Sequence, residues 1–218
     1  MRSVLLATLL LLVAAPAASA AEVDLELTPE ESRFGDATEV AGTVTDDAGA
    51  PVAGTEVTLV GRRYPFDGDY RSLERTTTDA EGRYRFEREF ERNWQVRALT
   101  AEDRSRTERV YVFPRFKLSF KARNERVIRV TQRYRTPHGV DLERPTVFYV
   151  GRRGRRTAPI AARAEVVRTR SGVFKSTALV RIPSKWNGNF RYASCFRYTV
   201  GSGMGRPSAT CPKRFRFE

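Results

Sequence analysis

Two copies of one short pattern, spaced 90 residues apart, constrain the fold of this chain more than any other feature. The sequence VTLVGRR at residues 57–63 matches VFYVGRR at residues 147–153. Gly82 also stands 90 positions before Gly172, each within a turn-like stretch. Matches that recur in one order at nearly one spacing predict a tandem repeat of one structural module.

A third match sets the length of the module. Residues 93–98 resemble residues 189–194 at a slightly longer offset, so each module has about 90 to 100 residues. We therefore expect two domains, residues 21–113 and residues 114–218. The joint lies at Pro114, because proline ends one strand before the next begins.

Within each repeat the apolar residues alternate with polar ones. Residues 83–87 alternate charged residues with Tyr84 and Phe86, and residues 190–200 place their aromatic residues at one parity, with Ser194 as the polar exception. A period of two gives a strand with one buried and one wet face. No apolar pattern of helical spacing persists for three turns. The predicted fold class is all-β, with two tandem immunoglobulin-like antiparallel β-sandwiches.

The first twenty residues have the pattern of a cleaved export signal. Arg2 precedes an apolar run at residues 4–13, and residues 18–20 form a small-residue cleavage site. The run is too short for a stable transmembrane helix, and no later stretch approaches 18 apolar residues. We expect a secreted, extracellular protein without a transmembrane anchor, either released or held at the cell surface by non-covalent contacts.

Two cysteines, Cys195 and Cys211, follow the export signal. In an oxidising compartment an isolated pair predicts one disulfide, which contributes about 3 kcal/mol for a loop of about 15 residues. The alternative is two free thiols or half of a metal site. A zinc site would need two more ligands, and the only histidine, His138, is far away in sequence.

Residues 42–59 and 77–86 carry a recognisable order of motifs. It consists of a strand, a turn, a Pro-Val-Ala-Gly step, a Val-x-Leu strand and a Thr-Asp-x-x-Gly-x-Tyr-x-Phe hairpin. This order resembles the carboxypeptidase regulatory-like, or transthyretin-like, bacterial immunoglobulin-like module, over residues 22–112. The resemblance implies an accessory, surface or adhesion element without catalysis. The second repeat keeps the turn at Gly172 but lacks two of the motifs, so we interpret it as a diverged copy from the internal repeat alone.

The two repeats differ in the sign of their net charge. Residues 21–112 contain 13 Arg and 21 acids, a net charge of −8, whereas residues 113–218 contain 25 Arg and Lys and 5 acids, a net charge of +20. Such asymmetry indicates a polyanion or a membrane surface as partner. Arginine outnumbers lysine by 34 to 5, a bias typical of a GC-rich bacterial genome. The bias weakens any argument that arginine was selected for bidentate phosphate recognition.

The candidate site is a set of arginines in the second repeat. If Ile128, Val130 and Tyr134 point inward, the arginines between them line the outer face of a strand. Further arginines lie on another strand and crowd one turn, where like charges repel unless anions are close. The candidate polyanion-binding residues are Arg129, Arg133, Arg135, Arg152, Arg153, Arg155, Arg156, Arg168 and Arg170. Alternatively, these arginines form a solvated face, or dock against the acidic repeat or a second copy.

Other functional classes find less support in the sequence. No paired acid and base or activated nucleophile is recognisable, so we predict no catalytic residues and no cofactor. Sequence-specific nucleic-acid recognition is not expected, because no reading helix is available. Acidic turns at residues 67–69 and 79–81 are possible calcium ligands, although acidic turns are common without metal. Trp186 lies in a turn and is a candidate for stacking on carbohydrate, whereas Trp94 is expected in the core.

The sequence therefore predicts an exported, non-catalytic binding or surface module. Its basic second domain would contact a cell-wall polymer, an acidic polysaccharide or extracellular nucleic acid. The alternative is a structural or protein–protein interaction element that assembles, with itself or an acidic protein surface, through its oppositely charged domains.

Overall fold

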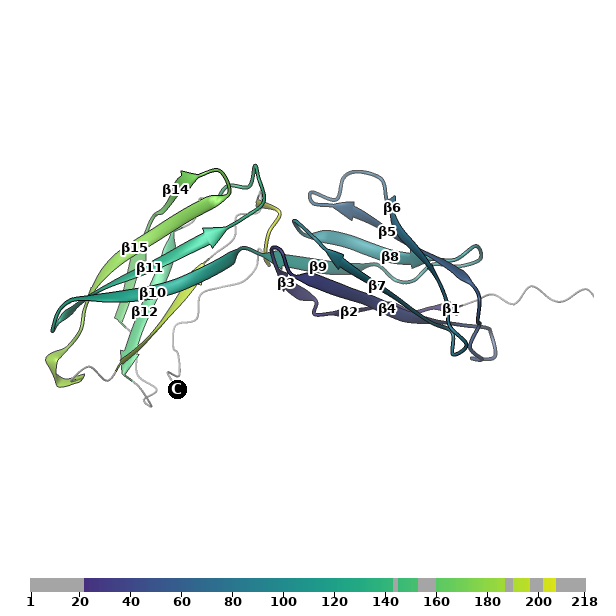
Figure 1. Ribbon diagram of the computed structural model, residues 1–218, viewed down its shortest axis with the longest axis horizontal. Helices are drawn as coiled ribbons and strands as arrows, with labels where there is room; N and C mark the ends of the chain where they lie inside the picture. Colours follow the sequence, from purple (N-terminus) through teal and green to yellow (C-terminus); the bar gives the residue numbers. More distant parts are fainter. Residues whose placement is uncertain (1–21, 143–144, 153–159, 187–189, 197–201, 207–218) are drawn as a thin grey trace, which may run out of the picture.

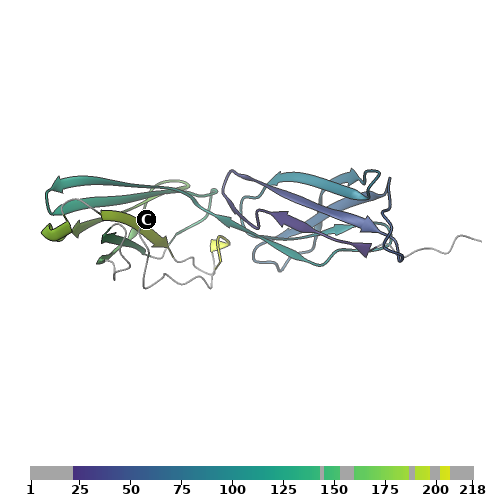
Figure 2. The same ribbon diagram turned by 90° about the horizontal axis from the view of Figure 1, so that it is seen from below.

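The computed structural model describes residues 22–142, 145–152, 160–186, 190–196 and 202–206. Two β-sandwiches follow one another along the long axis of the molecule (Figure 1 and Figure 2). The predicted all-β tandem is confirmed. The export signal at residues 1–20 lies outside the described residues. Within the described ranges, no helix has the length and apolar character needed to cross a membrane.

The first sandwich contains two sheets. In the smaller one, β4 pairs with β7 on one side and with β1 and β2 on the other. The strands of this sheet are β1 (Glu22–Val23), β2 (Glu26–Thr28), β4 (Ala37–Thr45) and β7 (Arg83–Glu89). The larger sheet has the order β3 (Glu31–Arg33), β9 (Glu108–Phe113), β8 (Trp94–Leu99), β5 (Glu56–Arg63) and β6 (Arg71–Thr77). Tyr84 and Phe86 are buried while Arg83 and Arg85 are exposed, as their alternation predicts.

The second sandwich repeats this plan with different edges. One sheet has the order β10 (Arg115–Asn124), β11 (Val127–Arg135), β15 (Val173–Arg181) and β14 (Val166–Arg170). The other has the order β13 (Ile160–Ala164), β12 (Thr146–Arg152) and β16 (Phe190–Phe196). Only Glu165 separates β13 from β14, so the chain changes sheets at this residue. Between the sheets lies an apolar cluster that includes Val130, Phe148 and Val180.

Strand pairing confirms the tandem repeat. The pairs β4–β7 and β5–β8 of the first sandwich correspond to β11–β15 and β12–β16 of the second. The repeated glycines occupy equivalent backbone sites. The carbonyl of Gly82 accepts a hydrogen bond from the N–H of Val44 at 2.8 Å, and that of Gly172 accepts one from Thr136 at 3.0 Å. Both glycines have left-handed backbone, with φ of 71° and 65°.

The two sandwiches meet at a joint that the chain crosses more than once. β9 ends at Phe113 and β10 begins at Arg115, on either side of Pro114. Residues 202–206 then return from the second sandwich and contact the first. One buried apolar cluster runs through the joint, because it includes Val112 of the first sandwich and Phe174 of the second.

Candidate polyanion-binding face

The sheet formed by β10, β11, β15 and β14 carries the central arginines of the candidate site. Ile128, Val130 and Tyr134 of β11 are buried, with at most 2% of their surface exposed. Arg133 and Arg135 are exposed, and Arg129 is half-buried. The predicted orientation of this strand is confirmed: its arginines lie on the outer side of the sandwich.

Strand register extends the cations into rows across the sheet. Arg133 lies opposite Lys117 of β10 on one side and opposite Lys175 of β15 on the other. Neighbouring strands are about 4.8 Å apart, so three like charges stand in one row, an arrangement that destabilises a sheet by itself. We call the outward cations of the three strands the basic face: Arg115, Lys117, Lys121, Arg129, Arg133, Arg135, Lys175 and Arg181.

This sheet contains no acidic residue. None of the 33 residues in β10, β11, β14 and β15 is Asp or Glu. Among the described residues, the ion pairs of these strands are those of Arg115 with Asp36 and of Arg168 with Asp141. Apart from Arg115, the members of the basic face have no carboxylate within ion-pair distance in that part of the chain. Their charge is therefore available to an external anion.

Lysines are concentrated on the basic face. The whole chain has five lysines, and three of them, Lys117, Lys121 and Lys175, lie on this one face. A codon bias toward arginine does not concentrate lysines. Lysine is a compact charge on a flexible stem and does not impose the fork geometry of a guanidinium. The mixture suits contact with diffuse negative charge more than recognition of one group.

A row of hydroxyl groups divides the basic face. Ser119, Thr131 and Thr177 lie opposite one another on β10, β11 and β15, one outward position away from the row of Arg133. The hydroxyls of Thr131 and Thr177 are 3.3 Å apart. Cations thus flank groups that can donate or accept hydrogen bonds.

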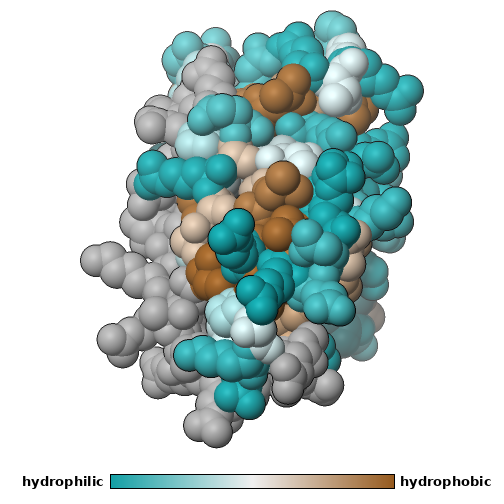
Figure 3. Space-filling view, turned by 90° about the vertical axis from the view of Figure 1, so that its left-hand side faces the viewer, coloured by the Kyte–Doolittle hydropathy of each residue, from teal (hydrophilic) through white to brown (hydrophobic). Residues whose placement is uncertain are grey.

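Among the described residues, the exposed large apolar side chains all lie on this sheet: Phe116, Phe120, Val167 and Leu179. Leu179 lies opposite Arg129 on the basic face and is 59% exposed, and Val167 lies opposite Lys175 and is 60% exposed. Seen from the end of the second sandwich, hydrophilic side chains surround small apolar areas (Figure 3). The described part of this surface is therefore mainly polar, with apolar areas between the hydrophilic side chains.

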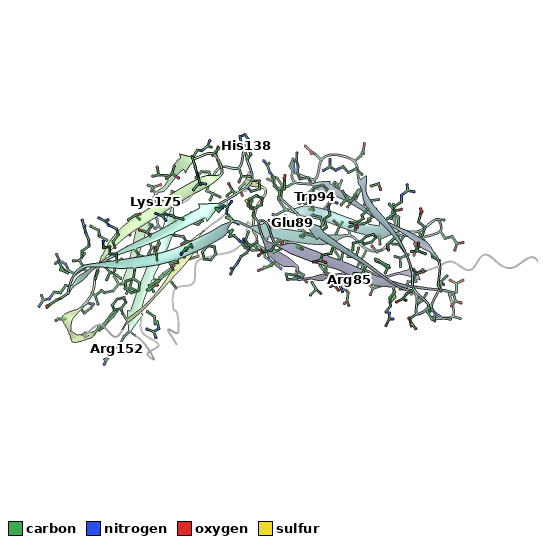
Figure 4. All side chains as sticks on the ribbon, in the orientation of Figure 1. Arg85, Glu89, Trp94, His138, Arg152 and Lys175 are labelled. Carbon is green, nitrogen blue, oxygen red and sulfur yellow. The ribbon has the colours of Figure 1, made fainter. Side chains whose placement is uncertain are left out.

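The remaining candidate arginines do not join the basic face as one surface. Arg168 and Arg170 are exposed on β14 at the edge of the same sheet, where Arg168 pairs with Asp141. Arg152 ends β12 in the opposite sheet, and Figure 4 shows it on a different side of the sandwich from Lys175. The arginines of the neighbouring turn lie outside the described residues: Arg153, Arg155 and Arg156.

Sequence reasoning missed the lysines of the basic face because it followed arginine runs. The signal was present, since Lys117, Ser119 and Lys121 alternate with apolar residues along β10. Lys175 and Thr177 do the same along β15. A period of two would have placed all of them outside.

Two other predictions concern aromatic residues. Trp94 is 5% exposed and belongs to the core of the first sandwich, as expected. The expectation that Trp186 is exposed for carbohydrate stacking is wrong. Trp186 lies on the short 3-10 helix η1 (Ser184–Trp186), is 9% exposed and packs into the core of the second sandwich. A turn at a sandwich end can bury its largest side chain, because the open end of the core lies beneath it.

Cys195 lies on β16, opposite Val147 of β12. Its expected partner, Cys211, lies outside the described residues, so the disulfide stays a prediction.

His138 is exposed in a turn, and its carbonyl accepts a hydrogen bond from Arg92 Nη2 at 3.4 Å. This position agrees with its interpretation as a surface-loop residue.

The acidic turn at Asp79 has a structural role. Its carboxylate accepts hydrogen bonds from the backbone N–H of Arg83 at 2.8 Å and of Glu81 at 3.0 Å. The bond from the Arg83 backbone is the main cause that lowers the pKa of Asp79. Across the described ranges, no three metal-ligating side chains converge to hold an ion.

Comparison with protein families matches residues 39–113 to the carboxypeptidase regulatory-like domain. The resemblance predicted for the first repeat is confirmed. A search of curated proteins finds no match.

Several solved structures are similar to the chain. They include invasin, described as a bacterial integrin-binding protein, with 12% identity and a TM-score of 0.38, over 90% of this chain and 39% of that one. The Escherichia coli adhesin FdeC has 12% identity and a TM-score of 0.38, over 93% and 65% of the two chains. Escherichia coli alpha-2-macroglobulin has 14% identity and a TM-score of 0.35, over 84% and 12%. The chain spans less than two thirds of each of these structures, and the fold described above follows from its own strand pairing.

Proposed function

We propose that this protein is an exported, non-catalytic module that binds a polyanion through the basic face. One observation carries the proposal. A whole four-stranded sheet lacks acidic residues and presents its cations in rows toward the outside. Rows of like charge raise the energy of the free protein, and a bound polyanion relieves this cost.

The joint between the sandwiches supports an external partner over internal docking. Arg115 pairs with Asp36 and Arg206 pairs with Glu30, so some cations do serve the contact between the two repeats. Apart from Arg115, the members of the basic face, Lys117 and Arg133 included, form no ion pair with the first sandwich among the described residues. The acidic first sandwich therefore leaves most of the basic face exposed.

The shape of the face favours contact with the backbone of a polymer. A sheet surface offers no reading helix, and the cations sit at the ends of flexible side chains, so we expect affinity without sequence readout. The ligand class is a cell-wall polymer, an acidic polysaccharide or extracellular nucleic acid. Export to the cell exterior, expected from the N-terminal signal pattern, would bring the protein to such polymers.

The proposal is tested by measuring binding of the mature chain, residues 21–218, across a salt series. The probes are duplex DNA, polygalacturonate, a phosphate-bearing cell-wall polymer and neutral dextran. The first variant replaces the central row by glutamine: Lys117→Gln, Arg133→Gln and Lys175→Gln. A matched control removes three exposed charges elsewhere on the second sandwich: Arg163→Gln, Lys185→Gln and Arg191→Gln.

We expect saturable binding to acidic polymers and none to dextran, with a steep loss of affinity as salt rises. For duplex DNA the logarithmic salt slope should fall by about two to three units in the row variant, because each neutralised phosphate contributes about 0.9. The control variant should keep most of the slope. If the row variant and the control variant weaken binding equally, net charge alone accounts for the interaction, and a defined binding face is refuted.

A further inference from the structure

The outer face of the larger sheet in the first sandwich carries a second group of arginines. Strand β8 alternates buried core residues with Gln95 and Arg97, whose side chains therefore lie on the outer side of the sheet. Gln95 lies opposite Arg62 of β5 on one side and opposite Arg109 of β9 on the other. Neighbouring strands are about 4.8 Å apart, and successive outward residues of one strand are about 7 Å apart. Three arginines therefore surround Gln95.

Aromatic rings contact all three guanidinium groups. The ring centre of Tyr70, which lies between β5 and β6, is 4.8 Å from Cζ of Arg62 and 3.6 Å from Cζ of Arg97. Cζ of Arg109 is 6.0 Å from the ring centre of Tyr111, and its Nη1 donates to the hydroxyl of that tyrosine at 3.5 Å. A cation within about 6 Å of a ring centre is attracted to the ring. These contacts give each guanidinium a defined position.

Residues 64–70 contact the outward side chains of β8 and β9. The hydroxyls of Tyr70 and Thr107 are 3.4 Å apart, and the ring centre of Phe66 is 5.3 Å from Cζ of Arg109. Phe66 has left-handed φ of 71°, which is unfavourable for a bulky residue. The fold therefore keeps this segment over the sheet at a local conformational cost, a feature that is enriched at binding sites.

The three arginines have no counter-ion in the described part of the protein. No carboxylate there lies within ion-pair distance of Arg62, Arg97 or Arg109, whereas Arg106, close by in the sequence, pairs with Glu108 at 2.7 Å. Arg97 is half-buried, and its Nε is shielded from solvent without a hydrogen-bond partner among the described residues. A partly desolvated charge raises the free energy of the protein unless an anion is close. An anion from outside would lower it.

We propose that this face of the first sandwich is a binding site for a carboxylated sugar, and that the site acts independently of the basic face. Oε1 of Gln95 accepts a hydrogen bond from Nε of Arg62 at 2.8 Å, so the amide and the guanidiniums offer mainly donors to a ligand. The planar fork of a guanidinium matches a carboxylate. Tyrosine combines an apolar ring with a hydroxyl, as a sugar ring combines C–H and O–H groups. We call the set the arginine–tyrosine site: Arg62, Tyr70, Gln95, Arg97, Arg109 and Tyr111.

Titration of the mature chain, residues 21–218, with a galacturonate trisaccharide tests the proposal. Binding is followed by calorimetry and by the NMR shifts of backbone amides at physiological salt. The comparison probes are a neutral galactose trisaccharide, inorganic phosphate and a glutamate tripeptide. We expect saturable binding of galacturonate alone, with shifts at Gln95, Arg97 and Arg109. The amide of Arg133 reports on the basic face, so the two sites succeed or fail separately.

Variants distinguish the arginine–tyrosine site from net charge. Arg97→Gln and Arg109→Gln should each weaken binding of the trisaccharide about 10-fold, because each removes a charge-assisted hydrogen bond. Arg75→Gln is the matched control, since Arg75 lies on β6 of the same sheet and pairs with Glu56. It should change the affinity by less than about 2-fold. The midpoint of thermal unfolding, measured for each variant, verifies that it is folded.

Four results would overturn the proposal. Shifts confined to Arg133 and its neighbours would place all binding on the basic face. An unchanged affinity in both Arg97→Gln and Arg109→Gln, with a lowered unfolding midpoint, would reduce these arginines to a structural role. An equal loss in Arg75→Gln would leave only net charge. Tighter binding of phosphate or of the glutamate tripeptide than of galacturonate would refute a sugar as the ligand.

Discussion

Replacement of Arg133 by glutamine should stabilise the fold while it weakens polymer binding. Arg133 lies between Lys117 and Lys175 in the central row of the basic face. Two charges about 5 Å apart in water repel by about 0.8 kcal/mol, and two such neighbours give about 1.7 kcal/mol. Screening at physiological salt roughly halves this value, and long side chains can spread apart. We expect a gain of about 0.5–1 kcal/mol in the free energy of unfolding.

The assay is urea denaturation of the Arg133→Gln variant and the unchanged protein at low, physiological and about 1 M salt. The stability gain should be largest at low salt and vanish at about 1 M, where the screening length is about 3 Å. In the binding experiment the same variant should lose about one unit of the salt slope for duplex DNA. Arg163→Gln, on the opposite sheet, is the control for charge removal as such.

A loss of stability in Arg133→Gln would refute the reasoning, because it would mean that Arg133 contributes more through packing than it costs through repulsion. A gain that persists at high salt would be equally damaging, since only an electrostatic origin is screened. An unchanged salt slope would show that Arg133 does not contact the polymer.

Three further predictions follow from local geometry. Gly82→Ala should lower the free energy of unfolding by more than about 1 kcal/mol in urea denaturation, because the added Cβ would lie 2.6 Å from the carbonyl oxygen of Val44. Gly49 also has left-handed backbone but lies in open space, so Gly49→Ala should cost less in the same assay. The hydrogen-bonded carboxylate of Asp79 has a lowered pKa, so its contribution is complete above the usual value of 3.8 and is lost as pH falls through the folded-state pKa. Acid unfolding of Asp79→Asn should accordingly begin from lower stability but vary less with pH. Trp186→Ala should cost about 3–5 kcal/mol, measured by denaturation, without a specific loss of carbohydrate binding.

Only part of the basic face could be predicted from the sequence. Alternation along β11 correctly placed Arg129, Arg133 and Arg135 outside, because side-chain direction in a strand follows from local backbone geometry. Their grouping with Arg152 failed, since β11 and β12 belong to different sheets. Strand periodicity determines which side of a strand faces solvent but does not determine which strands are neighbours.

The predictions for the two tryptophans had different outcomes for a similar reason. Trp94 alternates with Val96 and Ala98, and this regular pattern correctly placed it in the core. Trp186 lies in a short segment without periodicity, so nothing local revealed that it covers the end of the second core. Burial of a side chain in a turn depends on what lies beneath it.

Taken alone, the amino-acid sequence determined the β class, the tandem repeat, the resemblance of the first module and the separation of charge. These properties are readable because periodicity, turn glycines and net charge are local or additive along the chain. The tertiary structure was needed to show that Lys117, Arg133 and Lys175 form one row. It was also needed to show that Asn93 binds Gly205, 112 residues further along the chain. Register and docking of this kind depend on contacts between distant segments, which no local pattern in the sequence encodes.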